Sequence, residues 1–175
     1  MRYSRVYLLP LFALAWQGPP PSNLPVTVLR VLDGDTLDVR WHGSRFRVRL
    51  PGIDAPEMGQ PLRHSGDAGE LARACLLRVV AQGAWRLEWR GRDRYGRVLG
   101  ELFGPSGPIG DQLLEMGCAI PYAFAGDGPF RAAQRRRALE RARRARLGLW
   151  GRGGIEDPYQ WRRRQKTRRR PVANE

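Results

Sequence analysis

The sequence predicts an α+β fold, a small five-stranded Greek-key β-barrel with three helices packed on it. Short runs of alternating apolar and polar residues, separated by turns containing glycine, proline or aspartate, predict the strands. A longer segment with an apolar stripe at helical spacing lies among them and predicts an inserted helix. With 175 residues, 42% hydrophobic and 27% charged, the chain can form one globular domain with tails.

The first three strands are expected within residues 26–50. Apolar residues recur at every second position on either side of a turn at residues 42–44, which predicts one buried face for each strand. These residues are Leu37, Val39 and Trp41 before the turn and Phe46, Val48 and Leu50 after it. The intervening positions of the third strand hold Arg45, Arg47 and Arg49, which would point the other way.

The remaining elements complete the barrel and its helices. The inserted helix is expected over residues 67–81, with Ser65 as its N-terminal cap and a stripe of six apolar residues at i, i+3, i+4, i+7, i+8 and i+11. The fourth and fifth strands are expected at 84–89 and 97–103, and two further helices at 109–116 and 130–146. Five strands with an inserted helix fit a barrel of the OB type.

The two ends of the chain differ from its middle. Residues 1–24 combine early arginines, a short apolar run, an Ala13-Leu14-Ala15 cleavage site and a proline-rich linker, which is typical of a signal peptide. We therefore expect export, as a secreted or periplasmic protein; an uncleaved anchor or an apolar arm is the alternative. Residues 25–151 are expected to form the domain, and residues 152–175 a basic, disordered tail.

Charge and cysteine content narrow the class of partner. The formal net charge is +14, and Lys166 is the only lysine, so arginine supplies nearly all of the positive charge. Such an excess indicates a polyanionic partner, nucleic acid before an anionic membrane. Cys75 and Cys118 lack the spacing of a zinc site. One disulfide in an exported protein, or two small buried side chains, both fit them.

Two acidic turns frame the predicted hairpin. Asp33-Gly34-Asp35-Thr36 precedes it, and Asp54-Ala55-Pro56-Glu57 follows it, with the row of arginines between them. Clustered carboxylates beside fixed arginines suit a divalent cation that must meet a phosphate. The alternative is that the aspartates only stabilise turns, which we expect of Asp33.

Four motifs, in this order and spacing, resemble the staphylococcal nuclease (thermonuclease) family. They are Val31-Leu32-Asp33-Gly34-Asp35-Thr36, Arg49-Leu50-Pro51-Gly52-Ile53-Asp54-Ala55-Pro56-Glu57, Asp93-Arg94-Tyr95-Gly96-Arg97 and Leu147-Gly148-Leu149-Trp150. The resemblance covers roughly residues 25–150 and also implies the OB-like barrel. It implies a Ca²⁺-dependent phosphodiesterase that hydrolyses DNA and/or RNA with low sequence specificity, expels the 5′ oxygen and leaves 3′-phosphate products.

The resemblance further implies which residues hold the cation and activate water. Asp35 and Asp54 would supply two carboxylate ligands of Ca²⁺, and the backbone carbonyl of Ala55 a third. Glu57 would act as the general base, since a carboxylate beside a bound water can position or deprotonate it.

The residues expected to contact the nucleic acid are also implied by the resemblance. Arg49 and Arg97 would clamp the scissile phosphate, because a guanidinium binds phosphate oxygens in pairs and stays charged. Arg94, Tyr95 and Tyr122 would lie against the nucleotide as substrate-binding residues.

Two other functions remain open at this point. A non-catalytic OB-type module would bind nucleic acid without cutting it, although the complete set of site residues argues against that. An anchored surface protein would place its basic arm on anionic lipid. For the nuclease we expect a monomer whose partner is nucleic acid, with no stable membrane partner after processing.

Overall fold

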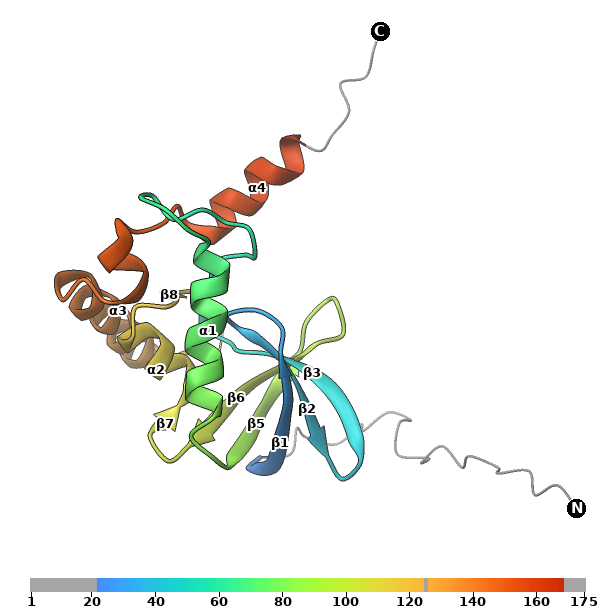
Figure 1. The fold of residues 1–175 in the computed structure, drawn as a ribbon. Coiled ribbons are helices and arrows are strands. Elements are labelled where there is room, and N and C mark those ends of the chain that lie inside the picture. The colour runs from blue at the N-terminus through green and yellow to red at the C-terminus, as the bar shows by residue number, and fades with distance from the viewer. Residues whose placement is uncertain (1–21, 125, 169–175) are drawn as a thin grey trace, which may run out of the picture.

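Five strands close into a barrel in the computed structural model, which describes residues 22–124 and 126–168 (Figure 1). They are β1 (Leu24–Val31), β2 (Thr36–Trp41), β3 (Ser44–Arg49), β5 (Trp85–Arg92) and β6 (Val98–Gly104). Neighbouring strands are antiparallel except β3 and β6, whose parallel pairing sets Val48 opposite Val98 and closes the barrel. The predicted α+β fold with a five-stranded OB-like barrel is therefore confirmed.

Alternate side chains of the strands fill the barrel, as the sequence pattern predicted. Leu37, Val39 and Val48 are fully buried, whereas Arg45 and Arg47 are exposed on the other face. Arg49 differs from the arginines before it and is only 15% exposed. It ends β3, and its guanidinium turns onto nearby carbonyl and carboxylate oxygens.

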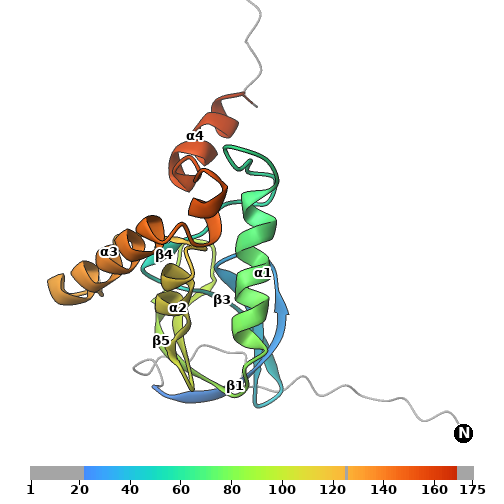
Figure 2. The ribbon, with the colours of Figure 1, turned by 60° about the vertical axis from the view of Figure 1, so that its left-hand side comes forward.

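Helix α1 (Ala68–Val80) runs along the barrel and buries the predicted stripe against it (Figures 1 and 2). Its N-terminal cap is Asp67, not Ser65 as predicted. The Asp67 carboxylate accepts hydrogen bonds from the backbone N–H groups of Gly69 and Glu70, and from that of Gly59 in the preceding loop. One aspartate therefore starts the helix and holds the loop in front of it.

A disulfide joins α1 to the segment after helix α2 (Ile109–Glu115). It links Cys75, on the buried face of α1, to Cys118. The sequence alone left open whether the two cysteines pair or only fill space. Residues just beyond Cys118 form the two-residue strand β8 (Ile120–Pro121), which pairs with β4 (Ile53–Asp54). The disulfide and this pairing fasten the acidic 54–57 loop to the helical side of the molecule.

Helix α3 (Pro129–Arg144) packs on α2 beside the barrel (Figure 2). Its inner face is thin, with Ala138 and Ala142 as its buried apolar residues. A buried arginine was not predicted, but Arg135 is only 2% exposed. It belongs to a group of ion-paired side chains from β6, α2 and α3, here called the helix cluster. The helix cluster consists of Glu101, Asp111, Asp127, Arg131 and Arg135.

The prediction of three helices and a disordered tail from residue 152 is wrong in one respect. After the 3-10 turn η2 (Gly148–Arg152), residues Pro158–Arg168 form a fourth helix, α4, which projects at the end of the molecule where the loop before α1 lies (Figures 1 and 2). Asp157 caps it by accepting from the N–H groups of Tyr159 and Gln160. Residues 169–175 lie outside the described residues.

The predicted signal peptide and linker fall mostly on residues 1–21, outside the described part. Export therefore stays a prediction, as does the division of the chain at residues 25 and 151. Strand β1 begins at Leu24, close to the proposed start of the domain. Between residues 22 and 168, apart from residue 125, no helix has both the length and the apolar character that crossing a bilayer requires.

Candidate active site

The first acidic turn places one carboxylate inside the barrel rim. Asp33 accepts a hydrogen bond from the backbone N–H of Asp35, the turn-stabilising role expected of it. This leaves the Asp35 side chain, which is buried, to accept from the Thr36 hydroxyl at 3.0 Å and from the backbone N–H of Ala55 at 2.8 Å. Gly34 makes the turn fit, because a Cβ there would stand 2.6 Å from those of both Ala55 and Ala72.

The second acidic turn brings Asp54 to the same point. β4 and β8 hold it in place, and only 1% of Asp54 is exposed. The Arg49 guanidinium lies between the two aspartates: its Nη2 is 3.0 Å from Asp35 Oδ2 and 3.2 Å from Asp54 Oδ1. Its Nη1 donates to the carbonyl of Ile53 at 3.0 Å. The two turns, 20 residues apart in the chain, are therefore joined through Ala55 and Arg49.

Burial makes Asp35 an unusual carboxyl group. Burial raises its pKa to about 7, Arg49 opposes that rise, and the nearby charges of Asp33 and Asp54 add to it. The largest cause is the loss of hydration, so the ionised form of Asp35 needs positive partners, and Arg49 supplies only part of that charge. A cation bound to Asp35 and Asp54 would supply more, which is the electrostatic property that a metal site needs.

Glu57 lies on the loop that leads from the second acidic turn to α1. Its backbone N–H donates to the side chain of Gln60 at 3.2 Å, and Gln60 is fully buried. The loop rests on α1 at Gly69, where a Cβ would come within 2.3 Å of the Glu57 carbonyl oxygen. The backbone is thereby fixed while the Glu57 side chain stays 40% exposed, open to water and substrate.

One site residue was missed by the sequence analysis. Arg162 of α4 reaches Asp54 with both nitrogens, Nη2 to Oδ2 at 2.7 Å and Nη1 to Oδ1 at 3.1 Å, and its Nη1 also donates to Glu57 at 2.7 Å. Burial alone would lower the pKa of Arg162, but the hydrogen bonds to Asp54 and Glu57 raise it above its usual value. Here Asp35, Arg49, Asp54, Glu57 and Arg162 are called the site cluster.

The predicted clamp residue Arg97 lies in a neighbouring turn rather than in the site cluster. Its Nε donates to Asp93 at 2.7 Å, and the pKa of Asp93, although burial raises it, is lowered overall by the hydrogen bonds from Arg97 and Tyr95. Tyr95 is exposed, with the guanidinium groups of Arg94 and Arg97 near its ring.

A shallow pocket of about 330 Å³ joins this turn to β3. It is lined by Asp38, Arg45, Phe46, Arg47, Tyr95, Gly96 and Arg97. Three arginines beside an exposed tyrosine suit a nucleotide, whose phosphate and base each find a partner there. The pairing of Val48 with Val98 sets the pocket and the Arg49 end of β3 at adjoining positions.

Tyr122, the other predicted substrate-binding residue, lies on the far side of the second acidic turn. Its backbone N–H donates to the carbonyl of Gly52 at 3.0 Å, just after strand β8, and its side chain is half exposed. Within the described residues, no hydrogen bond joins the Tyr122 side chain to the site cluster. The prediction that it touches the nucleotide stays untested.

The donor set fits a hard divalent cation. Asp35 and Asp54 direct carboxylate oxygens at one nitrogen of Arg49, and Ala55, which follows Asp54, donates its N–H to Asp35. Ca²⁺ takes oxygen ligands from carboxylates, backbone carbonyls and water, so two aspartates and a carbonyl are enough when water completes the shell. Within the described residues, no group of three or more histidine, cysteine or acidic side chains is arranged to hold a metal ion, so the proposed shell depends on two carboxylates, a carbonyl and water.

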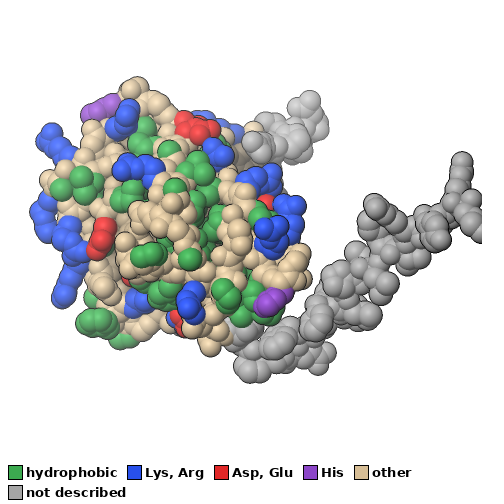
Figure 3. Space-filling view, turned by 60° about the horizontal axis from the view of Figure 1, so that its bottom comes forward, with side chains coloured by type: hydrophobic (Ala, Val, Ile, Leu, Met, Phe, Trp, Pro, Cys, Tyr) green, Lys and Arg blue, Asp and Glu red, His purple; other side chains and the backbone are tan. Residues whose placement is uncertain are grey.

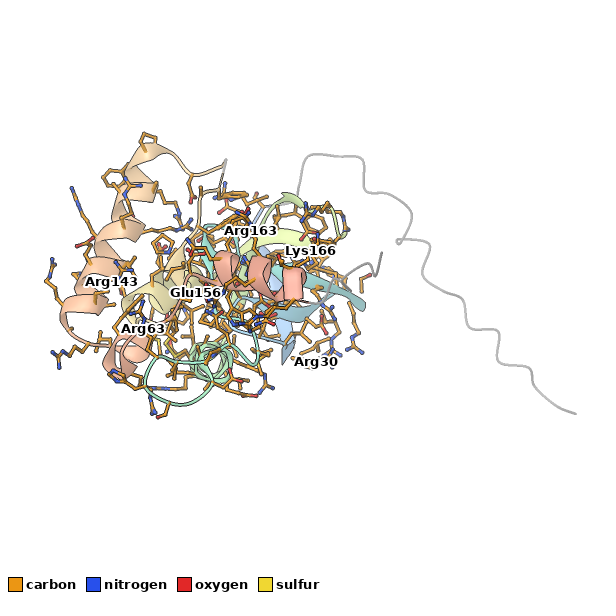
Figure 4. All side chains as sticks on the ribbon, turned by 90° about the horizontal axis from the view of Figure 1, so that it is seen from above. Arg30, Arg63, Arg143, Glu156, Arg163 and Lys166 are labelled. Atoms are coloured by element: carbon orange, nitrogen blue, oxygen red, sulfur yellow. A yellow bond between two sulfur atoms is a disulfide. The ribbon has the colours of Figure 1, made fainter. Side chains whose placement is uncertain are left out.

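Basic side chains from several elements surround the end of the molecule at which the site opens. Figure 4 looks down on this end, with Arg163 and Lys166 along α4 and Arg63 and Arg143 to one side. Figure 3 shows the opposite end of the barrel, where basic side chains are again more prominent than acidic ones. An acidic site cluster within a basic surface is suited to a polyanion that carries its own phosphate charge.

The chain is similar in sequence to known proteins. Residues 47–152 match the family described as staphylococcal nuclease homologue. The chain is 36% identical over 149 residues to a micrococcal nuclease of Shigella flexneri, covering 80% of this chain and 81% of that protein. It is 33% identical over 158 residues to an uncharacterized endonuclease of Escherichia coli, covering 90% and 96%, and 34% identical over 170 residues to Protein ParB of the same species, covering 91% and 90%.

Proposed function

The chain belongs to the staphylococcal nuclease family, and from that premise we propose that it is a Ca²⁺-dependent phosphodiesterase. Its substrates would be DNA and/or RNA, cut with low sequence specificity so that the 5′ oxygen leaves and the products end in 3′ phosphates. The relatives named as nucleases support hydrolysis of nucleic acid. The identity of the cation, the polarity of the cut and the roles of the residues are what we propose in addition.

One observation carries the proposal: four residues predicted to act together converge in space. Asp35, Arg49, Asp54 and Glu57 come from three segments, and contacts of 2.7–3.2 Å connect them directly or through Arg162. Structural turns alone would not require the two buried aspartates to meet beside an arginine. A non-catalytic binding module would have no need for buried carboxylates, which repel phosphate.

Asp35, Asp54 and the carbonyl of Ala55 would hold Ca²⁺, which when bound polarises the phosphate and neutralises its charge. Glu57, partly exposed on a fixed loop, is placed to take a proton from the attacking water. Arg49 and Arg97 would hold the phosphate oxygens as negative charge develops on them in the transition state. Arg94 and Tyr95 would bind the adjoining nucleotide.

The decisive experiment incubates the purified protein with plasmid DNA and with RNA in Ca²⁺, in Mg²⁺ and in chelator. We expect cleavage in Ca²⁺, little in Mg²⁺, which demands a tighter octahedron and keeps its waters, and none in chelator. The polarity of the cut is read by mass spectrometry on an oligonucleotide of known sequence, because the fragment that keeps the original 5′ end carries the new phosphate only if the 5′ oxygen leaves. Undiminished cleavage in chelator would contradict the metal site, and binding without cleavage in any condition would favour the non-catalytic module.

We further propose that the protein is exported and acts as a monomer. The N-terminal pattern and the Cys75–Cys118 disulfide support export, because disulfides persist in oxidising compartments. N-terminal sequencing of protein from its native host should find a start after Ala15 and before Pro25. An intact Met1 on a reduced cytosolic protein would contradict export, and size-exclusion chromatography tests the monomer.

A further inference from the structure

Arg162 occupies the carboxylate that the proposed cation needs most. Its planar fork covers both oxygens of Asp54, at 2.7 and 3.1 Å, and the same side chain contacts Glu57. Asp54 Oδ1 also accepts from Arg49. Within the described structure, each Asp54 oxygen is therefore already paired with positive charge, and Asp54 Oδ2 is paired through Arg162.

The contact between Arg162 and Asp54 is held in place by a foundation under α4, that is, by buried contacts at the start of the helix. Buried Gln60 accepts from the Glu57 backbone N–H and donates to the carbonyl of Glu156 at 2.8 Å, so one side chain ties the Glu57 loop to the start of α4. Ile155 lies with Leu62, Ala68 and Leu149 in a small apolar cluster at the same place. A helix anchored at its base carries Arg162 to the site one turn farther on.

A divalent cation and this guanidinium cannot both use Asp54 in this way. A hard cation needs a carboxylate oxygen directly, whereas the Arg162 fork uses the oxygen lone pairs that point toward it. The two positive groups would also repel each other at the few ångströms that separate ligands of one carboxylate. Loading of the site therefore requires Arg162 to leave Asp54.

We propose that Arg162 is an internal competitor of the divalent cation and sets the concentration at which the site is loaded. This rests on the proposed metal site at Asp35 and Asp54. With no divalent cation bound, Arg162 neutralises Asp54 and keeps hold of Glu57. When Ca²⁺ binds, Arg162 gives up Asp54, and the cost of breaking that bidentate pair weakens the apparent Ca²⁺ affinity.

Calorimetric titration of Ca²⁺ into the full chain tests this without relying on activity. Arg162→Gln should lower the Kd for Ca²⁺ roughly 10-fold or more, as expected for loss of a bidentate charged competitor. Arg163→Gln is the matched control, because it removes the same charge from the adjacent residue, which is exposed and stacks on Tyr159. It should change the Kd by no more than about 2-fold, the scale of a screened surface charge.

A second variant and a second measurement keep the outcome clear if Arg162→Gln folds poorly. Arg162→Lys keeps the charge but cannot fork over Asp54, so its Ca²⁺ affinity should fall between wild type and Arg162→Gln. Thermal unfolding should show that saturating Ca²⁺ raises the Tm of Arg162→Gln more than that of wild type, since tighter binding stabilises more.

The failures are distinguishable. Equal or weaker Ca²⁺ binding by Arg162→Gln, with wild-type binding intact, would overturn the competitor role and leave the nuclease proposal standing; Arg162 would then be a residue that positions Glu57 or phosphate. If none of the proteins binds Ca²⁺, the proposed metal site fails and the competitor role fails with it.

Discussion

The molecule contains two clusters of arginines and carboxylates with similar chemistry and different surroundings. In the helix cluster, Arg135 is 2% and Glu101 4% exposed, and the pairs join α3 to β6 and α2. In the site cluster, Asp54 is as deeply buried, but Glu57 is 40% and Arg162 36% exposed. The helix cluster is the more closed of the two, although Arg131 is 28% and Asp111 21% exposed, and the site cluster is open at the edge where a substrate phosphate would approach.

The difference shows how a structural charge cluster is told from a functional one. The helix cluster contains two arginines and three acids, and Arg131 and Arg135 each form ion pairs with all three acids. Every charge there is paired within the cluster and its three acids are at most 21% exposed, so its function is to hold α3 in place. In the site cluster the acids meet arginines that can exchange partners, since Arg49 and Arg162 both compete for Asp54. Shared partners occur in both clusters, so it is the exposure of Glu57 at one edge that marks the site cluster as the one that can do chemistry.

The largest expected effect comes from Glu57→Gln, which keeps size and polarity but removes the base. We expect kcat to fall by roughly 10²–10⁴-fold, with nucleic-acid affinity almost unchanged, because most affinity comes from phosphate contacts elsewhere on a +14 chain. The free energy of unfolding should change little, since Glu57 is partly exposed. Steady-state kinetics and filter binding measure both. Unchanged turnover would remove Glu57 from the mechanism and leave the nuclease assignment intact.

In the helix cluster we expect the reverse pattern. Arg135→Met keeps the length of the side chain but removes its charge from Glu101, Asp111 and Asp127. Breaking a buried ion pair from one side should lower the free energy of unfolding by about 3–5 kcal/mol, measured by urea denaturation. The kcat of the folded fraction should stay near wild type. Arg136→Met, at the exposed next position, is the control and should be almost neutral; equal losses in both variants would contradict the structural role.

The members of the two clusters that could be predicted from the sequence are those that lie close together along the chain. Asp35, Arg49, Asp54 and Glu57 lie within 23 residues and in motifs whose turns and strand alternation have local signatures. Arg162 lies 105 residues beyond Glu57, in an arginine-rich segment whose pattern indicates a solvated tail. No local sequence feature distinguishes Arg162 from the neighbouring arginines. It reaches the site because the contacts at the start of α4 position this helix.

The same limit applies to the buried arginine and to the helix cap. In α3 many positions are arginine, so periodicity indicates an exposed helix and cannot single out Arg135. Ser65 and Asp67 are both good N-cap residues, and the choice of Asp67 depends on the tertiary position of the loop that it also binds. Local patterns therefore predicted the barrel and the acidic turns, whereas long-range charge pairing was visible only in the structure.

The free energy of unfolding measured across a range of pH tests the unusual burial of Asp35 in the site cluster. Its pKa is raised to about 7 by burial, from 3.8, so its neutral form favours the folded state. The stability from this group is complete below pH 4 and is lost as pH rises toward 7, by up to about 1.4 kcal/mol per pH unit. Urea denaturation in chelator should show that Asp35→Asn gains on wild type as pH rises through this window. Parallel curves would contradict the raised pKa, and saturating Ca²⁺ should flatten the wild-type loss.

The smallest expected effect comes from Arg97→Lys. Arg97 belongs to neither cluster, and its role could be structural or catalytic. Arg97 is 31% exposed and has one acidic partner, Asp93, within its own turn. Lysine keeps the charge but loses the planar fork that can hold Asp93 and a phosphate oxygen together. We expect kcat to fall about 10-fold, less than for loss of a whole phosphate-binding charge, with little change in affinity.

The outcome of Arg97→Lys decides whether the turn at residues 93–97 belongs with the site cluster. If kcat falls while affinity and the free energy of unfolding hold, Arg97 acts on the transition state although it lies outside the site cluster in the structure. Arg94→Lys is the matched control, because Arg94 lies in the same turn, and is predicted to bind substrate rather than to clamp the scissile phosphate; its effect should appear in KM. A fall in the free energy of unfolding with unchanged kcat would instead give Arg97 a structural role like that of Arg135, in which its charge holds the turn at residues 93–97.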